Sequence, residues 1–283
     1  NSAALRAVGA DEAAHPGMQR DRCGRPTGRL DRADDWLRAA VGGSTFPDLA
    51  AVGRTLAECG VTGVTDCTPY RTPDGPEAIA DAVRLGKLPQ RVVLTGHVDL
   101  LNAPPIDGVE LGPVKVIVDE ADLPEFDQLI DTITRSHCSG RTVAIHLVTA
   151  AATAFALAAW RASGSLPGDR IEHGSVLTPP MAELIAQLGL TVVTQPGFIA
   201  ERGDQYLADV DPGDIENLYR CASLRRLGIP VAGSTDAPYT DADPWRGIRA
   251  AIDRRSPTGR VIGKAESLSG PAVLALFAGD PLR

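Results

Sequence analysis

The sequence predicts an α/β fold in which parallel strands alternate with helices. From about residue 60, short runs rich in β-branched residues alternate with longer amphipathic stretches. The short runs are almost continuously apolar, which is typical of a sheet covered on both faces. We expect strands at 60–66, 91–95, 114–118, 142–146, 170–173, 191–195 and 229–236. The clearest helical stretches are 123–135, 150–162, 179–188 and 214–227.

Strands separated by helices form right-handed βαβ units, and two sheet arrangements accommodate them. The seven expected strands are one short of a closed (β/α)8 TIM-like barrel, which typically takes ~250 residues. An open doubly wound sheet is the alternative, but no GxGxxG motif follows a first strand. Residues 1–45 are rich in Arg, Asp, Gly and Ala. We therefore predict a loop-rich segment over 1–45, packed on a barrel domain over 46–283.

The composition favours a small-molecule partner. A net charge of −8 without a dense Lys/Arg run argues against nucleic acid or an anionic membrane. The longest apolar run, 145–160, is too short for a spanning helix, and the N-terminus lacks the pattern of a secretion signal. Five scattered cysteines suit reduced thiols, so a cytoplasmic location is expected. The sequence leaves open whether the chain forms a homo-oligomer.

Four polar residues lie within or at the ends of separate apolar runs, and they carry the functional argument. They are Lys115, His146, His173 and Asp236. In a barrel, the C-terminal ends of the strands converge on one mouth, where active sites lie. Imidazole nitrogens and carboxylate oxygens bind Zn²⁺ and similar ions, and a metal so held acidifies bound water. Asp236 is the candidate to accept the proton of that water.

Each of these residues also has a purely structural explanation. A histidine at a strand end can be a hydrogen-bonded core residue, and Asp236 can cap a turn. Lys115 can extend its ammonium to water, or pair with Asp119 or Glu120. Four such residues ending four strands are hard to obtain from independent structural needs. Two further residues are candidates for substrate binding: His97, which follows a strand, and Gln195, which ends one. Arg170 is expected in a structural ion pair.

Four segments carry a resemblance to a known family. They are 112–115 (GPVK), 143–146 (VAIH), 169–173 (DRIEH) and 233–238 (GSTDAP). In this order they resemble the fourth, fifth, sixth and eighth strands of the amidohydrolase superfamily, in the branch called amidohydrolase family 3. The segments 1–5 and 60–66 fit the same branch, so the resemblance spans nearly the whole chain.

The resemblance implies a barrel that lacks its first strand. Family members carry an HxH pair on that strand, and this chain has no HxH and resembles the sequence downstream of it. The expected metal ligands are therefore Lys115, carbamylated and bridging two ions, together with His146, His173 and Asp236. The expected cofactor is a divalent metal, zinc in the first place, as one or two ions.

Two functions follow. The first is hydrolysis of a C–N bond, such as an amide or formamide, in a small molecule through metal-activated water, with Asp236 as the catalytic residue. The alternative is an inactive barrel that acts as a binding or assembly module, because the first strand and its ligands are absent.

Overall fold

A computed structural model describes residues 2–31, 33–42, 46–100 and 104–279 of the chain. The chain forms two compact units, residues 1–48 and 49–283. The boundary that we predicted after residue 45 adjoins residues 43–45, which lie outside the described residues, as does Asn1. The predicted packing of the first segment on the barrel stays a prediction.

The N-terminal unit contains short helices and one hairpin. Strands β1 (Met18–Arg20) and β2 (Pro26–Leu30) pair in antiparallel fashion between helices α1 (Ser2–Ala7) and α2 (Asp34–Ala40). The Asp21 carboxylate accepts hydrogen bonds from two backbone amides of the connecting turn. This local bonding explains why a segment rich in Asp and Gly forms the exposed hairpin loop.

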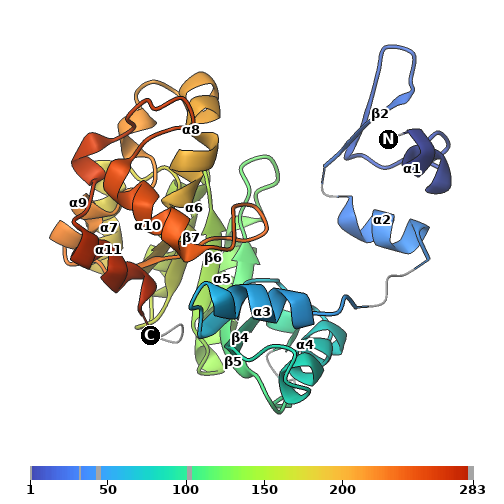
Figure 1. Ribbon diagram of the computed structural model, residues 1–283, viewed down its shortest axis with the longest axis horizontal. Coiled ribbons are helices and arrows are strands. Elements are labelled where there is room, and N and C mark those ends of the chain that lie inside the picture. Colours follow the sequence, from blue (N-terminus) through green and yellow to red (C-terminus); the bar gives the residue numbers. More distant parts are fainter. Residues whose placement is uncertain (1, 32, 43–45, 101–103, 280–283) are drawn as a thin grey trace. The chain divides into compact units, whose positions relative to one another are not determined.

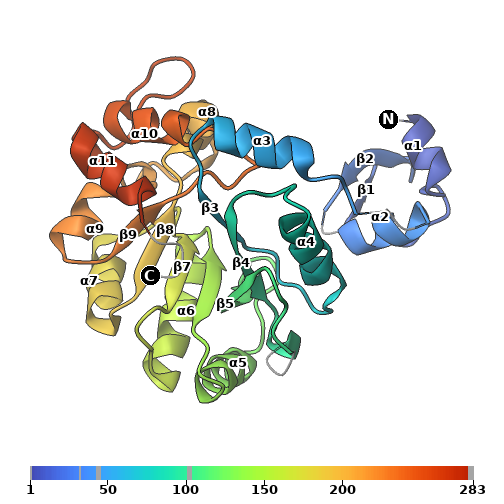
Figure 2. The same ribbon diagram turned by 60° about the horizontal axis from the view of Figure 1, so that its bottom comes forward.

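The larger unit is built on a seven-stranded parallel sheet in the order β3-β4-β5-β6-β7-β8-β9. Its strands are β3 (Gly63–Asp66), β4 (Arg91–Gly96), β5 (Glu110–Ile117), β6 (Val143–Leu147), β7 (Arg170–His173), β8 (Thr191–Thr194) and β9 (Val231–Gly233). The longer helices are α3 (Ala50–Glu58), α4 (Asp74–Arg84), α5 (Phe126–Cys138), α6 (Ala150–Ser163), α7 (Pro179–Leu188), α8 (Gly197–Asp209), α10 (Pro244–Asp253) and α11 (Gly270–Phe277). Helices α4 to α7 lie around the outside of the sheet (Figures 1 and 2).

The sheet curls as an incomplete barrel, as the sequence predicts. Cys67, just beyond edge strand β3, approaches Glu172 of β7, with its Sγ 3.7 Å from Oε1. Because three strands separate β3 from β7, this contact crosses the concave face. Among the described residues, no strand joins β3 to β9, so both edges are open. The fold class is therefore the predicted α/β barrel without a closing strand.

The main hydrophobic core fills the space between the convex face of the sheet and helices α5 to α7. Side chains alternate along each strand, so Ile145 and Ile171 enter this core and their neighbours His146 and Glu172 face the concave side. Trp160 of α6 is fully buried in the same core. The apolar residues from which the strands were predicted are thus the ones that pack against helices α5 to α7.

Two expectations about elements are corrected. The predicted helix at 214–227 is two short pieces, a 3₁₀ turn (Ile215–Asn217) and α9 (Ala222–Arg226). Between them Tyr219 has a φ of 45°, a left-handed conformation that interrupts a helix. The predicted strand at 229–236 ends at Gly233, so Asp236 lies in the loop beyond β9.

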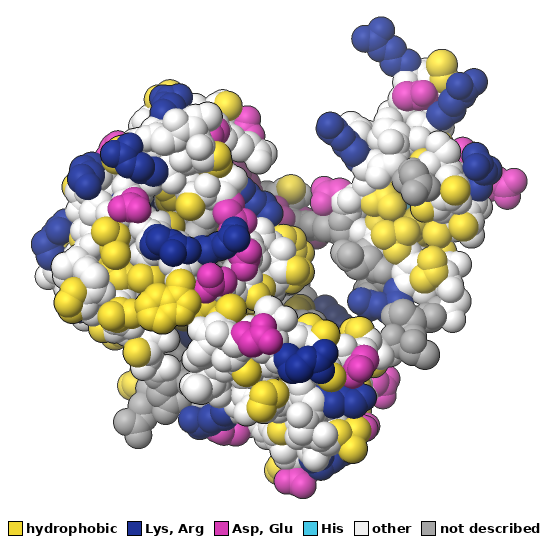
Figure 3. Space-filling view, in the orientation of Figure 1, with side chains coloured by type: hydrophobic (Ala, Val, Ile, Leu, Met, Phe, Trp, Pro, Cys, Tyr) yellow, Lys and Arg dark blue, Asp and Glu magenta, His cyan; other side chains and the backbone are white. Residues whose placement is uncertain are grey.

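Within the described residues, no helix is long and apolar enough to cross a membrane. The five cysteines are free thiols. Basic and acidic side chains are interspersed over the visible face of the molecule (Figure 3). The predicted compartment and partner class stay predictions.

Candidate active site

Three of the four predicted ligands meet at the C-terminal edge of the sheet. His146 and His173 contact each other edge to face, with ring centroids 4.4 Å apart. The Nδ1 of His173 lies 3.9 Å from Oδ2 of Asp236. The strand register explains the first contact, because Leu147 pairs with His173 and His146 pairs with Glu172. Adjacent parallel strands therefore deliver both imidazoles to one place.

Two of these residues have left-handed backbones. The φ of His173 is 71° and that of Asp236 is 56°, a region that residues other than glycine rarely adopt. At Asp236 the conformation is held by a turn, in which the Tyr239 amide donates to the Asp236 carbonyl at 2.9 Å. Such backbone strain is concentrated at functional sites. It supports a functional reason for these two conformations.

A hydrogen-bond network fixes the tautomer of His173. The Nε2 of Gln195 donates to the Val193 carbonyl at 3.3 Å and to Oγ of Ser234 at 2.9 Å. A carbonyl only accepts, so this atom is the amide nitrogen, and Oε1 faces Nδ1 of His173 at 2.9 Å. Since Oε1 also only accepts, Nδ1 carries the proton. The Nε2 of His173 then keeps a free lone pair, as a metal ligand requires.

Burial keeps both imidazoles neutral. It lowers the pKa of His146 to about 4, and the charge of Lys115, together with that of His173 whenever His173 is protonated, lowers it further. The pKa of His173 is also lowered by burial, although Asp236 opposes the shift. The pKa of Asp236 is raised, because burial outweighs the attraction of His173 and Lys115. At neutral pH the site thus offers two uncharged nitrogen donors beside one carboxyl group.

Lys115 lies on the concave face of β5 with 4% of its surface exposed. Its positive charge influences His146, His173 and Asp236, so the ammonium lies near the other candidate ligands. Within the described part of the chain, no hydrogen bond or ion pair to this ammonium is found. The ammonium is not among the buried side-chain atoms without a partner in the described residues, so it reaches the surface of the concave face, where a ligand or a modification can use it.

These donors fit a divalent cation in part. Neutral imidazole and carboxylate are the correct chemical groups for zinc. However, no set of three or more His, Cys, Asp or Glu side chains is arranged to hold an ion among the described residues. A cation at this place needs at least one further ligand, and the predicted four-residue metal site stays a prediction.

The two predicted substrate-binding residues occupy different positions. His97 follows β4, where its Nδ1 lies 2.8 Å from Oδ2 of Asp99 and its side chain is 24% exposed. Gln195 is 2% exposed and lies behind His173, to which it is hydrogen-bonded. Contact of either residue with substrate stays a prediction, whereas orientation of His173 by Gln195 is seen directly.

Sequence reasoning gave no role to Glu172, which lies on the concave face beside the site. It is 3% exposed and accepts a hydrogen bond from Nε of Arg170 at 2.7 Å, which confirms the expected ion pair of Arg170. Burial raises the pKa of Glu172, but Arg170 and Lys115 outweigh burial and the pKa is lowered. Burial and this carboxylate raise the pKa of Cys67 to about 12, so its thiol is not a nucleophile at neutral pH.

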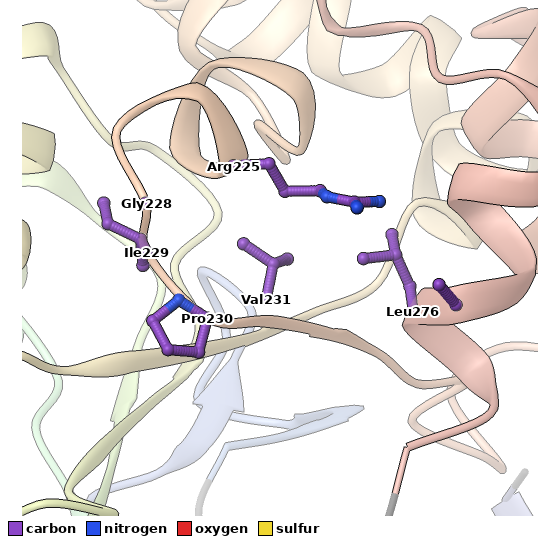
Figure 4. A pocket seen from close by; sticks show the side chains of 7 residues that line it. Arg225, Gly228, Ile229, Pro230, Val231 and Leu276 are labelled. Carbon is purple, nitrogen blue, oxygen red and sulfur yellow. The ribbon is translucent and has the colours of Figure 1, made fainter.

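A surface hollow lies elsewhere in the larger unit. It has a volume of about 290 Å³ and is lined by Arg225 of α9, by residues at the start of β9 such as Val231, and by Leu276 of α11 (Figure 4). These residues are at the opposite end of β9 from Asp236. Barrel active sites lie at the C-terminal ends of the strands, so the imidazole pair, and not this hollow, is the candidate active site.

The family model described as "Amidohydrolase family" matches residues 1–283. A protein of Bacillus subtilis (strain 168), with the provisional name amidohydrolase YtcJ, is 26% identical over 90% of this chain and 56% of its own length.

Two solved structures share the fold. An uncharacterized metal-dependent hydrolase from Pyrococcus furiosus matches with a TM-score of 0.76 and 22% identity, over 98% of this chain and 63% of its own. A second, from Pyrococcus horikoshii, matches with a TM-score of 0.76 and 20% identity, over 96% and 62%. The chain thus spans less than two thirds of each of these three relatives. The chain belongs to the amidohydrolase family.

Proposed function

We propose that this chain supplies the barrel of a metal-dependent hydrolase that cleaves a C–N bond, an amide or formamide, in a small molecule. The observation that carries the proposal is the pair of neutral imidazoles, His146 and His173, in contact beside Asp236 at the sheet edge. Family membership supports hydrolysis, and the names of the two Pyrococcus relatives support a metal.

In this proposal His146 and His173 hold the cation, zinc in the first place, through unprotonated ring nitrogens. Gln195 fixes the ring of His173 so that Nε2 is available. A bound divalent cation supplies Lewis acidity, which lowers the pKa of a coordinated water and polarises a carbonyl. Lys115, if carbamylated as the resemblance implies, would exchange its positive charge for an anionic oxygen donor and would supply a further ligand.

Asp236 moves the proton. Its carboxyl group lies 3.9 Å from His173 and its side chain is 30% exposed, so it is accessible from the mouth. It accepts a proton from the attacking water and delivers it to the leaving nitrogen. The raised pKa of Asp236 suits this task, because a stronger base takes the proton more readily.

Metal content and turnover of the purified chain test the proposal. The protein is loaded with Zn²⁺, Mn²⁺ or Co²⁺, dialysed and measured by elemental analysis, then assayed on formamides and N-acyl amides. We expect close to one ion or more per chain, with loss of that ion in His173→Ala. His15→Ala, in the N-terminal unit, is the matched control and should retain the metal.

An inactive binding module is the second candidate, and the absence of a three-ligand group among the described residues favours it. Metal below a tenth of an equivalent under these conditions, with no turnover, supports that alternative and rejects the hydrolase. Turnover that disappears in Asp236→Asn rejects the inactive module.

A further inference from the structure

One face of α8 carries an arginine on an aromatic surface. Phe198, Arg202 and Tyr206 are spaced four residues apart, so they share one side of the helix. The Arg202 guanidinium lies over the Phe198 ring, 5.1 Å from its centroid. Phe198 stacks on Tyr219 with ring centroids 5.6 Å apart, and the hydroxyls of Tyr206 and Tyr219 are 2.9 Å apart. These contacts hold the guanidinium in a defined place.

That place is beside the candidate catalytic residue. The Nη2 of Arg202 donates to the Tyr239 carbonyl at 3.0 Å, and the Tyr239 amide donates to the carbonyl of Asp236 at 2.9 Å. Arg202 is therefore attached to the turn that begins at Asp236. In agreement, its charge lowers the pKa of the Asp236 carboxyl group, against the larger effect of burial. Figure 1 shows α8 in the upper part of the larger unit.

Most of the hydrogen-bonding capacity of Arg202 is unused. A guanidinium has five N–H donors, and the Tyr239 carbonyl occupies one edge at Nη2. In the described part of the chain, no carboxylate forms an ion pair with Arg202, whereas Arg71, Arg170 and Arg220 each have one. The residue is exposed, so its remaining donors are open to a ligand.

We propose that Arg202 binds an anionic group, a carboxylate in the first place, on the ligand whose amide lies at His173 and Asp236. A fixed, planar fork with free donors matches carboxylate geometry. The exposed ring of Tyr239, at 66%, provides an adjacent apolar surface. This inference rests on the proposed function and narrows its substrates to amides that carry a negative charge.

The alternative role of Arg202 is to anchor the turn at Tyr239 without touching ligand. The two roles differ in charge selectivity. Loss of an anchor disturbs Asp236 and weakens every ligand, whereas loss of an anion site weakens only the charged ones. Matched ligands therefore separate the roles better than any single activity measurement.

The experiment measures dissociation constants by NMR titration of the zinc-loaded full chain. The ligands are N-acetylglycine and N-acetylphenylalanine, each compared with its uncharged primary amide. We expect the wild type to prefer the anions, and Arg202→Gln to weaken anion binding by about 10- to 100-fold while changing amide binding less than twofold. Arg202→Lys keeps the charge but loses the fork, so an intermediate affinity is expected. Arg255→Gln is the control, since Arg255 is also exposed and donates to one carbonyl.

Each other outcome overturns the inference. Equal weakening of anions and amides by Arg202→Gln identifies a turn anchor, and unchanged binding of both excludes a role in recognition. Failure of the wild type to bind either ligand at millimolar concentration also rejects the site. Anion binding that depends on Arg202 without any hydrolysis rejects the proposed function alone, and hydrolysis without charge preference rejects this inference alone.

Discussion

The side-chain oxygen of Gln195 accepts a hydrogen bond of 2.9 Å from Nδ1 of His173. The side-chain amide of Gln195 cannot be flipped to exchange its nitrogen and oxygen, because the nitrogen donates to the Val193 carbonyl and to Ser234. The imidazole is therefore held in one tautomer by a residue just beyond the end of the next strand, β8. Groups that orient a metal-binding histidine in this way are often as important as the ligand itself.

Replacement of Gln195 by alanine should weaken metal binding. Without the acceptor, the His173 ring can rotate and carry its proton on either nitrogen, so the affinity for Zn²⁺ should fall about 10- to 100-fold. Gln195→Glu keeps an acceptor and should lose less. Competition with a chromophoric chelator measures the affinity. Gln205→Ala on the exposed side of α8 is the control, and an equal loss in both variants would contradict the orienting role.

Particular residues show which parts of this structure sequence patterns can predict. β7 and α7 match their predicted limits, because Pro179 favours the first turn of a helix and Gly189, with a φ of 65°, ends it. The prediction of one helix over 214–227 was wrong because of a contact with a residue distant in the sequence. Buried Arg254 donates to the carbonyls of Leu218 and Tyr219, and these bonds replace the helical ones.

In the candidate site, too, local sequence patterns predict some features, whereas others depend on contacts between residues far apart in the chain. Histidine at the ends of two neighbouring strands is visible in the sequence, and the parallel sheet brings His146 and His173 together. The burial of Glu172 against Cys67 depends on the curl of the sheet, which joins residues far apart in the chain. The role of Arg202 on α8 was missed for another reason. Arg202 follows no strand, and its position depends on contacts with Phe198 and Tyr239.

His146 should make the stability of the metal-free chain depend on pH. Its pKa is about 4 in the folded protein and 6.5 in the reference state, so the unfolded chain binds the proton first as the pH falls. The stability that the neutral imidazole contributes is complete above pH 6.5 and is lost between pH 6.5 and about 4. The loss is at most about 3 kcal/mol.

Urea unfolding in the presence of a chelator, from pH 7 to pH 4, measures this effect. The free-energy difference between wild type and His146→Gln should change in favour of the variant as the pH falls, because glutamine does not titrate. A difference that is constant over this range would show that His146 is not buried in its neutral form.

Removal of Arg170 alone should destabilise the protein more than removal of Arg170 and Glu172 together. Arg170→Met leaves the Glu172 carboxylate, 3% exposed, without its hydrogen bond of 2.7 Å. We expect a loss of about 3–5 kcal/mol in the free energy of unfolding. The double variant Arg170→Met/Glu172→Leu removes both charges and should regain most of that loss. Urea unfolding of the two single variants and the double variant completes the cycle, and additive effects would contradict a coupled pair.

Asp169 should be among the most sensitive positions for folding, although it lies at the opposite end of β7 from the candidate site. Its carboxylate is fully buried and accepts hydrogen bonds from the side chains of His137 and Trp160 and from the amides of Val143 and Leu166. It therefore joins α5, β6 and α6.

Asp169→Ala leaves these donors unsatisfied and should cost at least about 3 kcal/mol of unfolding free energy. Trp160→Phe removes one donor and keeps the ring, so about 1–2 kcal/mol is expected. Thermal and urea unfolding measure both variants, and a smaller loss for Asp169→Ala than for Trp160→Phe would show that the carboxylate does not organise this layer.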